Sequence, residues 1–168
     1  MPQPSPEYST EHDDLRRMLD EQRWLLSQTV SALSPEQLAL TPTVSTLSLG
    51  SILAHVAVVE GQWLDRMGAP PAAPSALLGT GASFPVVTGA HREALLAAVT
   101  EAGQRTADWL AGEPDLSQRV PLPVADWFPP GGTWSRRQVI AHLLREIAQH
   151  SGHADIIRES IDGQRTMG

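Results

Sequence analysis

Apolar residues recur along the N-terminal part of the chain with the spacing of an amphipathic helix. The run begins at Leu15, Met18 and Leu19 and continues at intervals of three and four residues. Positions spaced in this way share one face of an α-helix, because the helix makes one turn every ~3.6 residues. We therefore predict a helix over about residues 10–33, preceded by a polar, proline-rich and flexible tail over residues 1–9.

The same periodicity returns three times further along the chain. It predicts helices over about residues 48–67, 88–111 and 135–161. The last of these has a clear start signal, because Ser135 is followed three residues later by Gln138, which is the spacing of a capping box. Four long amphipathic segments are typical of a helical bundle.

Two long connections separate the predicted helices. Residues 69–87 and 113–132 are rich in proline, alanine and glycine, and neither shows a convincing strand pattern. Ser34 and Pro35 predict one short additional helical turn. We expect a single all-α domain over residues 1–168, a four-helix bundle whose long crossover connections exclude a simple up-down-up-down order. Connections of this length in a compact domain are often functional.

The composition of the chain argues against several classes of binding partner. The net charge is −7, which argues against nucleic-acid binding, because phosphate recognition needs clustered cations. No apolar run approaches the ~20 residues that span a bilayer. The N-terminus has neither the basic nor the apolar region of a signal peptide. We expect a cytoplasmic protein that binds neither nucleic acid nor a membrane.

The chain contains neither cysteine nor lysine, and all twelve basic residues are arginine. The lack of cysteine excludes disulfides, cysteine-ligated zinc and a cysteine nucleophile. The lack of lysine, together with abundant alanine, glycine and proline, indicates a GC-rich genome, because lysine codons are rich in adenine.

Candidate metal-binding residues cluster on the last predicted helix. Three of the six histidines fall between positions 142 and 153, and Glu146 lies among them. On a helical wheel His150 points deepest toward the apolar face, Glu146 comes next, and His142 points furthest away. A carboxylate directed toward a core is costly unless it is paired or binds a cation. Glu146 and His150 are four residues apart, so they lie one above the other and can share one ion.

A third donor is available on the second long helix. His55 lies among strongly apolar neighbours there. Two histidines and one glutamate suit zinc best, with nickel, manganese or iron as alternatives, and three protein ligands leave a position open, as in catalytic sites. Two other interpretations remain: His55 as a core histidine, and Glu146 with His150 as a solvated pair. The HExxH signature is absent.

Three segments of the chain resemble the DinB superfamily. They read LDEQRWLLSQTVSALSPEQLAL, STLSLGSILAHVAVVEGQWLDRM and HLLREIAQHSGHADIIRESIDG, and the likeness extends from about residue 12 to 163. The closer similarity is to the actinobacterial branch of mycothiol-dependent transferases, including the similar mycothiol-dependent maleylpyruvate isomerase. That resemblance implies a divalent metal held by His55, Glu146 and His150. More distant members carry histidine where this chain has Glu146, which favours the mycothiol branch.

The resemblance implies a metal-dependent thiol S-transferase that joins mycothiol to an electrophilic small molecule. The chain has no cysteine, so the nucleophile would come from this low-molecular-weight thiol. The choice of electrophile is expected to depend on the connections 69–87 and 113–132. The alternatives are a non-catalytic protein that binds a metal or small molecule, and a metal-dependent hydrolase. The resemblance also implies a homodimer, and the lysine-free composition agrees with an actinobacterial source.

Three further residues on the last helix are candidates for the site. His153 lies one turn after His150 on the same side, and we predict that it is catalytic, orienting the thiol or accepting its proton. The alternative is a histidine at the helix edge that packs against Trp63 or a loop. Asp155 and Arg158 are the candidates for binding the thiol cofactor.

Overall fold

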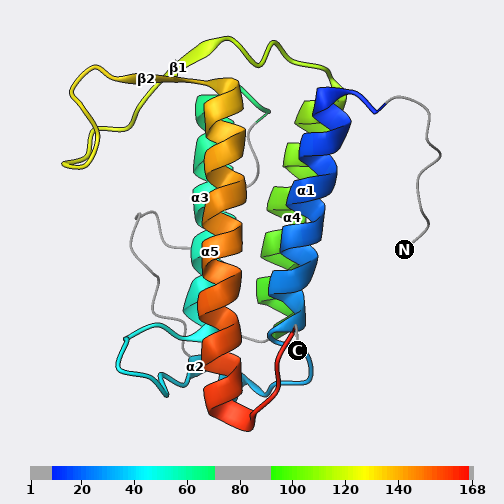
Figure 1. The fold of residues 1–168 in the computed structure, drawn as a ribbon, viewed down its shortest axis with the longest axis vertical. Coiled ribbons are helices and arrows are strands. Elements are labelled where there is room, and N and C mark those ends of the chain that lie inside the picture. Colours follow the sequence, from blue (N-terminus) through cyan, green and yellow to red (C-terminus); the bar gives the residue numbers. More distant parts are fainter. Residues whose placement is uncertain (1–8, 71–91, 167–168) are drawn as a thin grey trace.

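The computed structural model describes residues 9–70 and 92–166. This part of the chain is a bundle of long helices with one small hairpin at one end (Figure 1). The helices are α1 (Glu11–Gln28), α2 (Pro35–Ala39), α3 (Leu49–Arg66), α4 (Arg92–Ala111) and α5 (Arg136–Asp162). The prediction of an all-α four-helix bundle is confirmed, with α2 as the short additional turn. None of these helices is both long and apolar enough to cross a membrane.

The order of the helices is not up-down-up-down. α1 and α5 run in one direction, and α3 and α4 run in the other (Figure 1). α3 and α1 each pack against both α4 and α5. Consequently α3 and α5 are antiparallel neighbours, whereas α3 and α4 are parallel neighbours. Because α3 ends and α4 starts at opposite ends of the bundle, the chain must cross the length of the bundle between them, as predicted.

Side-chain caps begin most of the helices. α1, α2, α3 and α5 start with complete capping boxes, at Thr10, Ser34, Ser48 and Ser135. Each box satisfies backbone N–H groups that have no partner inside the helix. α5 ends at Gly163, whose φ of 77° is a conformation that glycine adopts without strain. The capping box predicted at Ser135 and Gln138 therefore forms.

α1 ends five residues earlier than its predicted boundary. The helix stops at Gln28, and Ala32 adopts a positive φ of 61° in the turn that follows. Val30 and Leu33 in this turn are nevertheless buried. Their burial explains the error, because the apolar spacing continues past the point where the backbone leaves the helix.

The connection between α4 and α5 contains a hairpin that the sequence analysis did not predict. Strands β1 (Arg119–Pro121) and β2 (Thr133–Ser135) pair antiparallel, with Val120 opposite Trp134. Each strand has only three residues, which is too short for a pattern of alternating burial. The other connection, predicted over residues 69–87, lies almost entirely outside the described residues, as do the first four residues of the helix predicted to start at 88.

A buried polar cluster lies inside the otherwise apolar core. Glu60 on α3 is 1% exposed, and Arg23 on α1 donates two hydrogen bonds to it, of 3.1 Å from Nε to Oε2 and 2.6 Å from Nη2 to Oε1. The hydroxyl of Thr106 on α4 donates a third. A Cβ atom at Gly103 would lie 2.8 Å from Cδ of Arg23, so the arginine needs a glycine here. The cluster ties three helices together.

Candidate metal centre

The three predicted ligands meet where α3 and α5 pack together. His55 offers one donor atom from α3, and Glu146 and His150 offer one each from α5. These donor atoms all lie within 4.8 Å of one another. Residues far apart in the sequence converge because the two helices are antiparallel neighbours. Among the described residues, this is the one group of three or more such side chains placed to hold a metal ion.

The spacing of the donors matches a bound ion better than direct hydrogen bonds alone. Oε2 of Glu146 lies 3.4 Å from Nε2 of His150 and 4.0 Å from Nε2 of His55. In a tetrahedral zinc site with bonds of about 2.1 Å, ligand atoms are about 3.4 Å apart. Small movements of these side chains would therefore bring all three donors to a divalent ion of the first transition row. The donor chemistry fits as well, with two imidazole nitrogens and one carboxylate oxygen.

The protonation states favour metal binding. Burial lowers the pKa of His55, nearby His150 lowers it further, and Glu146 opposes these effects in part. The imidazole is therefore neutral near pH 7, which is the form that binds metals. A hydrogen bond from His150 is the main cause that lowers the pKa of Glu146, against the opposing effect of burial. The glutamate is thus ionised, although its side chain is only 22% exposed.

His142 does not point away from the site, which corrects the helical-wheel prediction. Its side chain is largely buried, with ring centroids 5.3 Å from Trp63 and 5.2 Å from Trp134. Its Nδ1 lies 3.6 Å from Oε1 of Glu146 and accepts a hydrogen bond of 2.7 Å from Arg145. The wheel treated the core as the only apolar surface, whereas the hairpin covers this side of α5.

His153 lies beside the donors without being one of them. Its ring centroid is 5.6 Å from that of His150, and its Nδ1 is buried without a hydrogen-bond partner in the described part of the chain. It does not line the large cavity described below. A Cβ atom at neighbouring Gly152 would meet open space. The structure thus places His153 next to a ligand, and its catalytic role stays a prediction.

Asp155 and Arg158 are engaged elsewhere, and neither lines the cavity. Asp155 accepts hydrogen bonds from the backbone and hydroxyl of Thr166. Buried Arg158 donates from Nη1 to the backbone carbonyls of Thr29 and Ser31. At 1.5 Å per residue, Arg158 lies about 18 Å along the helix from Glu146. These positions give no support to the predicted thiol-binding role, because proximity in the sequence does not place the side chains at the site.

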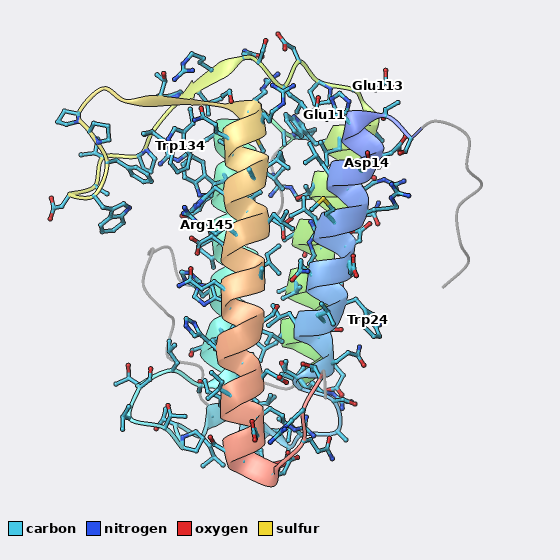
Figure 2. All side chains as sticks on the ribbon, viewed as in Figure 1. Glu11, Asp14, Trp24, Glu113, Trp134 and Arg145 are labelled. Atoms are coloured by element: carbon cyan, nitrogen blue, oxygen red, sulfur yellow. The ribbon has the colours of Figure 1, made fainter. Side chains whose placement is uncertain are left out.

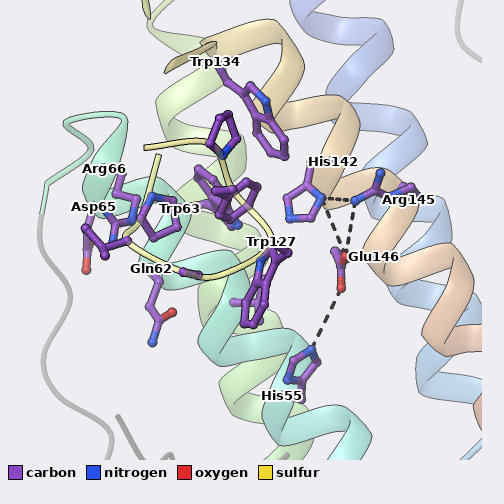
Figure 3. Close-up of a pocket in the computed structure, with 16 residues that line it drawn as sticks. His55, Gln62, Trp63, Asp65, Arg66, Trp127, Trp134, His142, Arg145 and Glu146 are labelled. Atoms are coloured by element: carbon purple, nitrogen blue, oxygen red, sulfur yellow. Dashed lines mark hydrogen bonds and ion pairs between the residues drawn. The ribbon is translucent and has the colours of Figure 1, made fainter. Parts of the chain in front are cut away.

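A cavity of about 1210 Å³ opens above the metal donors. His55 and Glu146 lie at one end of it (Figure 3), and residues 123–125 and 127–129 of the hairpin tip form part of its wall. Figure 2 shows Trp134 and Arg145 on the side of α5 that faces this hairpin. The connection predicted to be functional therefore adjoins the metal centre.

Aromatic side chains make up much of the cavity wall. Sequence reasoning assigned the tryptophans to the core or to loops and did not predict this wall. One sequence feature could have indicated it: Trp127 and Phe128 are adjacent in a proline-rich connection of a chain that has few aromatic residues. Apart from the proposed ligand His55, the aromatic rings that line the cavity belong to Trp63, Trp127, Phe128, Trp134 and His142.

Comparison with known proteins agrees with this architecture. The crystal structure of a conserved protein from Enterococcus faecalis aligns with a TM-score of 0.66 over 94% of this chain and 100% of its own, at 14% identity, which shows a shared fold. No curated protein matches the sequence. The model of the Mycothiol-S-transferase family matches residues 14–163. The chain therefore belongs to the mycothiol-S-transferase family, within the DinB-like superfamily.

Proposed function

We propose that this protein is a metal-dependent S-transferase that joins mycothiol to an electrophilic small molecule. The observation that carries the proposal is the convergence of His55, Glu146 and His150, the first two of which line one end of an open cavity. Membership of the mycothiol-S-transferase family supports the choice of thiol. The absence of cysteine agrees with a nucleophile that arrives from solution. We propose zinc, because two nitrogens and one oxygen suit it.

The residues of the site have separate tasks in this reaction. A metal ion in such a site lowers the pKa of a bound thiol, so that the sulfur is a thiolate at neutral pH. His55 and His150 would supply nitrogen donors, and Glu146 would supply the negative charge that holds a cation in a partly buried position. The cavity keeps the electrophile beside the sulfur, so the reactants meet without a bimolecular search. A sulfur–carbon bond forms, the leaving group departs with its bonding electrons, and the thiol proton passes to solvent.

The metal ligands can be tested by elemental analysis of the purified protein. About one metal per chain is expected in the wild type. His55→Ala and His150→Ala should each reduce this content sharply. His12→Ala is the matched control, because His12 lies at the start of α1 and donates a hydrogen bond to the backbone of Pro114. Full metal retention in both ligand variants would contradict the assignment.

The thiol can be tested on the protein loaded with cobalt(II). Addition of mycothiol should produce a sulfur-to-metal charge-transfer band and release close to one proton per site near pH 7. The band should appear at a lower concentration of mycothiol than of glutathione. Turnover of a thiol-reactive electrophile in the presence of mycothiol separates a transferase from a binding protein. Absence of the band at saturating thiol would instead favour the hydrolase, in which the metal activates water.

His153 is proposed as a functional residue that does not bind the metal. His153→Ala should keep its metal but lose transfer rate by about 10²-fold or more if the residue acts as a general base. A rate equal to that of the wild type would assign His153 to packing against His150.

We also propose a homodimer, as the family resemblance implies. Light scattering at micromolar concentration measures the mass directly. A clean monomer mass would reject the dimer and leave the metal centre unaffected, because all three donors come from one chain.

A further inference from the structure

The acidic groups that line the cavity are already engaged. Asp65 forms an ion pair of 2.8 Å with Arg105, which lies outside the cavity lining. Glu146 is surrounded by three histidines and would hold the metal. Neither carboxylate is therefore a free counter-charge for the arginines of the cavity.

Two arginines line the same cavity. Arg145 lies beside the metal donors, with Nη2 3.7 Å from Oε1 of Glu146, and its side chain is largely exposed. Its hydrogen bond to His142 directs the guanidinium toward the donors (Figure 3). Arg66 lies at the other side of the cavity and forms no hydrogen bond or ion pair within the described part of the chain.

The balance of charge in the loaded site favours an anionic co-substrate. A divalent metal, the Glu146 carboxylate and a bound thiolate together have no net charge. Asp65 and Arg105 also cancel. Arg145 then has no carboxylate nearby except Glu146, whose charge the metal would already neutralise, and Arg66 forms no ion pair within the described residues, in a chain whose net charge is −7. A cation confined in a cavity with low-dielectric walls attracts anions more strongly than one in open solvent.

The wall of the cavity favours a flat co-substrate. Trp63 and Trp134 stack with ring centroids 5.3 Å apart and an interplanar angle of 13°. Phe128 meets both of them edge-on. Trp127 is 73% exposed, and its ring overhangs the part of the cavity near His55 and Glu146 (Figure 3). A large exposed indole that no core residue covers offers a stacking surface for a planar ring.

We propose that this cavity selects aromatic electrophiles that bear a carboxylate, with the carboxylate bound by Arg145 and the ring stacked on Trp127. This inference rests on the proposed function, since it names the electrophile of the same site. Arginine suits the task because its planar guanidinium donates two parallel hydrogen bonds to a carboxylate.

The kinetic test compares two aryl chlorides that differ in one carboxylate. The probes are 4-chloro-3-nitrobenzoate and the neutral 1-chloro-2-nitrobenzene, each with mycothiol and the metal-loaded protein. The thiolate sulfur bonds to the ring carbon, chloride leaves with the bonding electrons, and the thiol proton goes to solvent. Hydrogen bonds to charged groups correspond to about 10-fold or more in affinity, so the carboxylate should raise kcat/KM by about that factor.

Removal of the cation should abolish this preference. In Arg145→Gln, the ratio of KM for the benzoate to KM for the neutral chloride, both measured in the same variant, should rise about 10-fold or more. Arg145→Lys should keep part of the preference that Arg145→Gln loses, because lysine keeps the positive charge but lacks the planar guanidinium that donates two parallel hydrogen bonds. Arg16→Gln removes one charge from the surface of α1 and is the control. Metal content is measured in every variant. A preference that survives in Arg145→Gln, or a wild type that prefers the neutral chloride, would overturn the proposal.

A binding experiment keeps this test separate from transferase activity. Calorimetric titration of the metal-loaded protein with 4-nitrobenzoate and with neutral nitrobenzene needs neither thiol nor turnover. The benzoate should bind more tightly, and Arg145→Gln should weaken it about 10-fold or more. Trp127→Ala should weaken both probes, whereas Trp24→Ala, which removes an exposed tryptophan from α1, should weaken neither. Equal binding of the two probes would overturn the inference even if thiol transfer is confirmed. A preference for the benzoate that Arg145→Gln removes would support it even if transfer fails, whereas a preference that persists in Arg145→Gln would show that the carboxylate binds the open metal position and would overturn it.

Discussion

Glu60 is fully buried in the bundle and Glu146 is partly buried, and the two carboxylates have different kinds of neighbours. Glu60 receives two hydrogen bonds from Arg23 and one from Thr106. Glu146 is surrounded by His55, His142, His150 and Arg145, with closest atom distances of 3.4–4.0 Å. The first carboxylate is held by short bonds to permanent partners, and the second lies among donors spaced widely enough for an ion.

This difference separates a structural polar cluster from a functional one. A buried charge is tolerated only when its partners compensate for the loss of water. Arg23 and Thr106 provide that compensation for Glu60 whether or not a ligand is present. Glu146 keeps a side chain that is 22% exposed and opens on the cavity, so a solvent-borne cation can reach it. Loss of the two carboxylates should therefore affect different properties of the protein.

The largest expected effect comes from removal of Glu60. Glu60→Ala leaves Arg23 buried without its partner, which typically costs about 3–5 kcal/mol in free energy of unfolding. Glu146→Ala, compared in metal-free protein, should cost less than about 1 kcal/mol, because partly exposed pairs contribute little. Urea denaturation in the presence of a chelator measures both. Similar losses for the two variants would show that the comparison is wrong.

Substitution of two glycines, one beside each carboxylate cluster, tests the same difference. Gly103→Ala places a methyl group 2.8 Å from Cδ of Arg23. Overpacking of this kind lowers the free energy of unfolding by about 1–3 kcal/mol. This loss exceeds the gain from the higher helix propensity of alanine. Gly152→Ala meets open space beside the metal centre, and it should raise the stability by about 0.5–1 kcal/mol. Thermal unfolding of the metal-free variants checks the opposite signs, and two changes of equal sign would refute the prediction.

A smaller effect concerns pH. The pKa of folded His55 is below the ordinary value of 6.5, chiefly because of burial. The unfolded chain therefore binds a proton more readily, and the metal-free protein should lose stability as pH falls below 6.5, by at most about 1.4 kcal/mol per pH unit for one group. Burial lowers the pKa of His142 as well, so His55→Gln should flatten the dependence in part. An unchanged slope between pH 7.5 and 5.5 would contradict this account.

The metal centre was predictable because its determinants are local. Glu146 and His150 share a face by their spacing, and apolar neighbours direct His55 inward. The resemblance then specified that these residues act together. The Arg23–Glu60 pair was not predicted, because a single sequence does not reveal which polar residues of different helices meet. Gly103, inside a helix, was the available signal.

The sequence analysis predicted that the connection over residues 113–132 is functional, but it did not predict the cavity that this connection helps to form. The two three-residue strands form because they pair with each other and because β2 continues directly into α5, and no periodicity in the sequence reveals such pairing. The orientation of His142 depended on that hairpin and was therefore wrong. The role predicted for Arg158 stays without structural support for another reason: α5 is long enough that two of its side chains can lie far apart, and Arg158 donates hydrogen bonds to the backbone of Thr29 and Ser31.

The hairpin stem makes the substrate-facing loop a separable module. Ser135 both ends β2 and caps α5, and Leu122 donates a backbone hydrogen bond of 2.9 Å to Gly132 at the base of the loop. All three metal donors lie on α3 and α5, outside this loop. Loop residues 123–131 can therefore be exchanged for others without altering a metal donor or a helix boundary. Under the proposed function, grafting loops of different sequence onto this stem would change the range of electrophiles while the helical bundle stays the same.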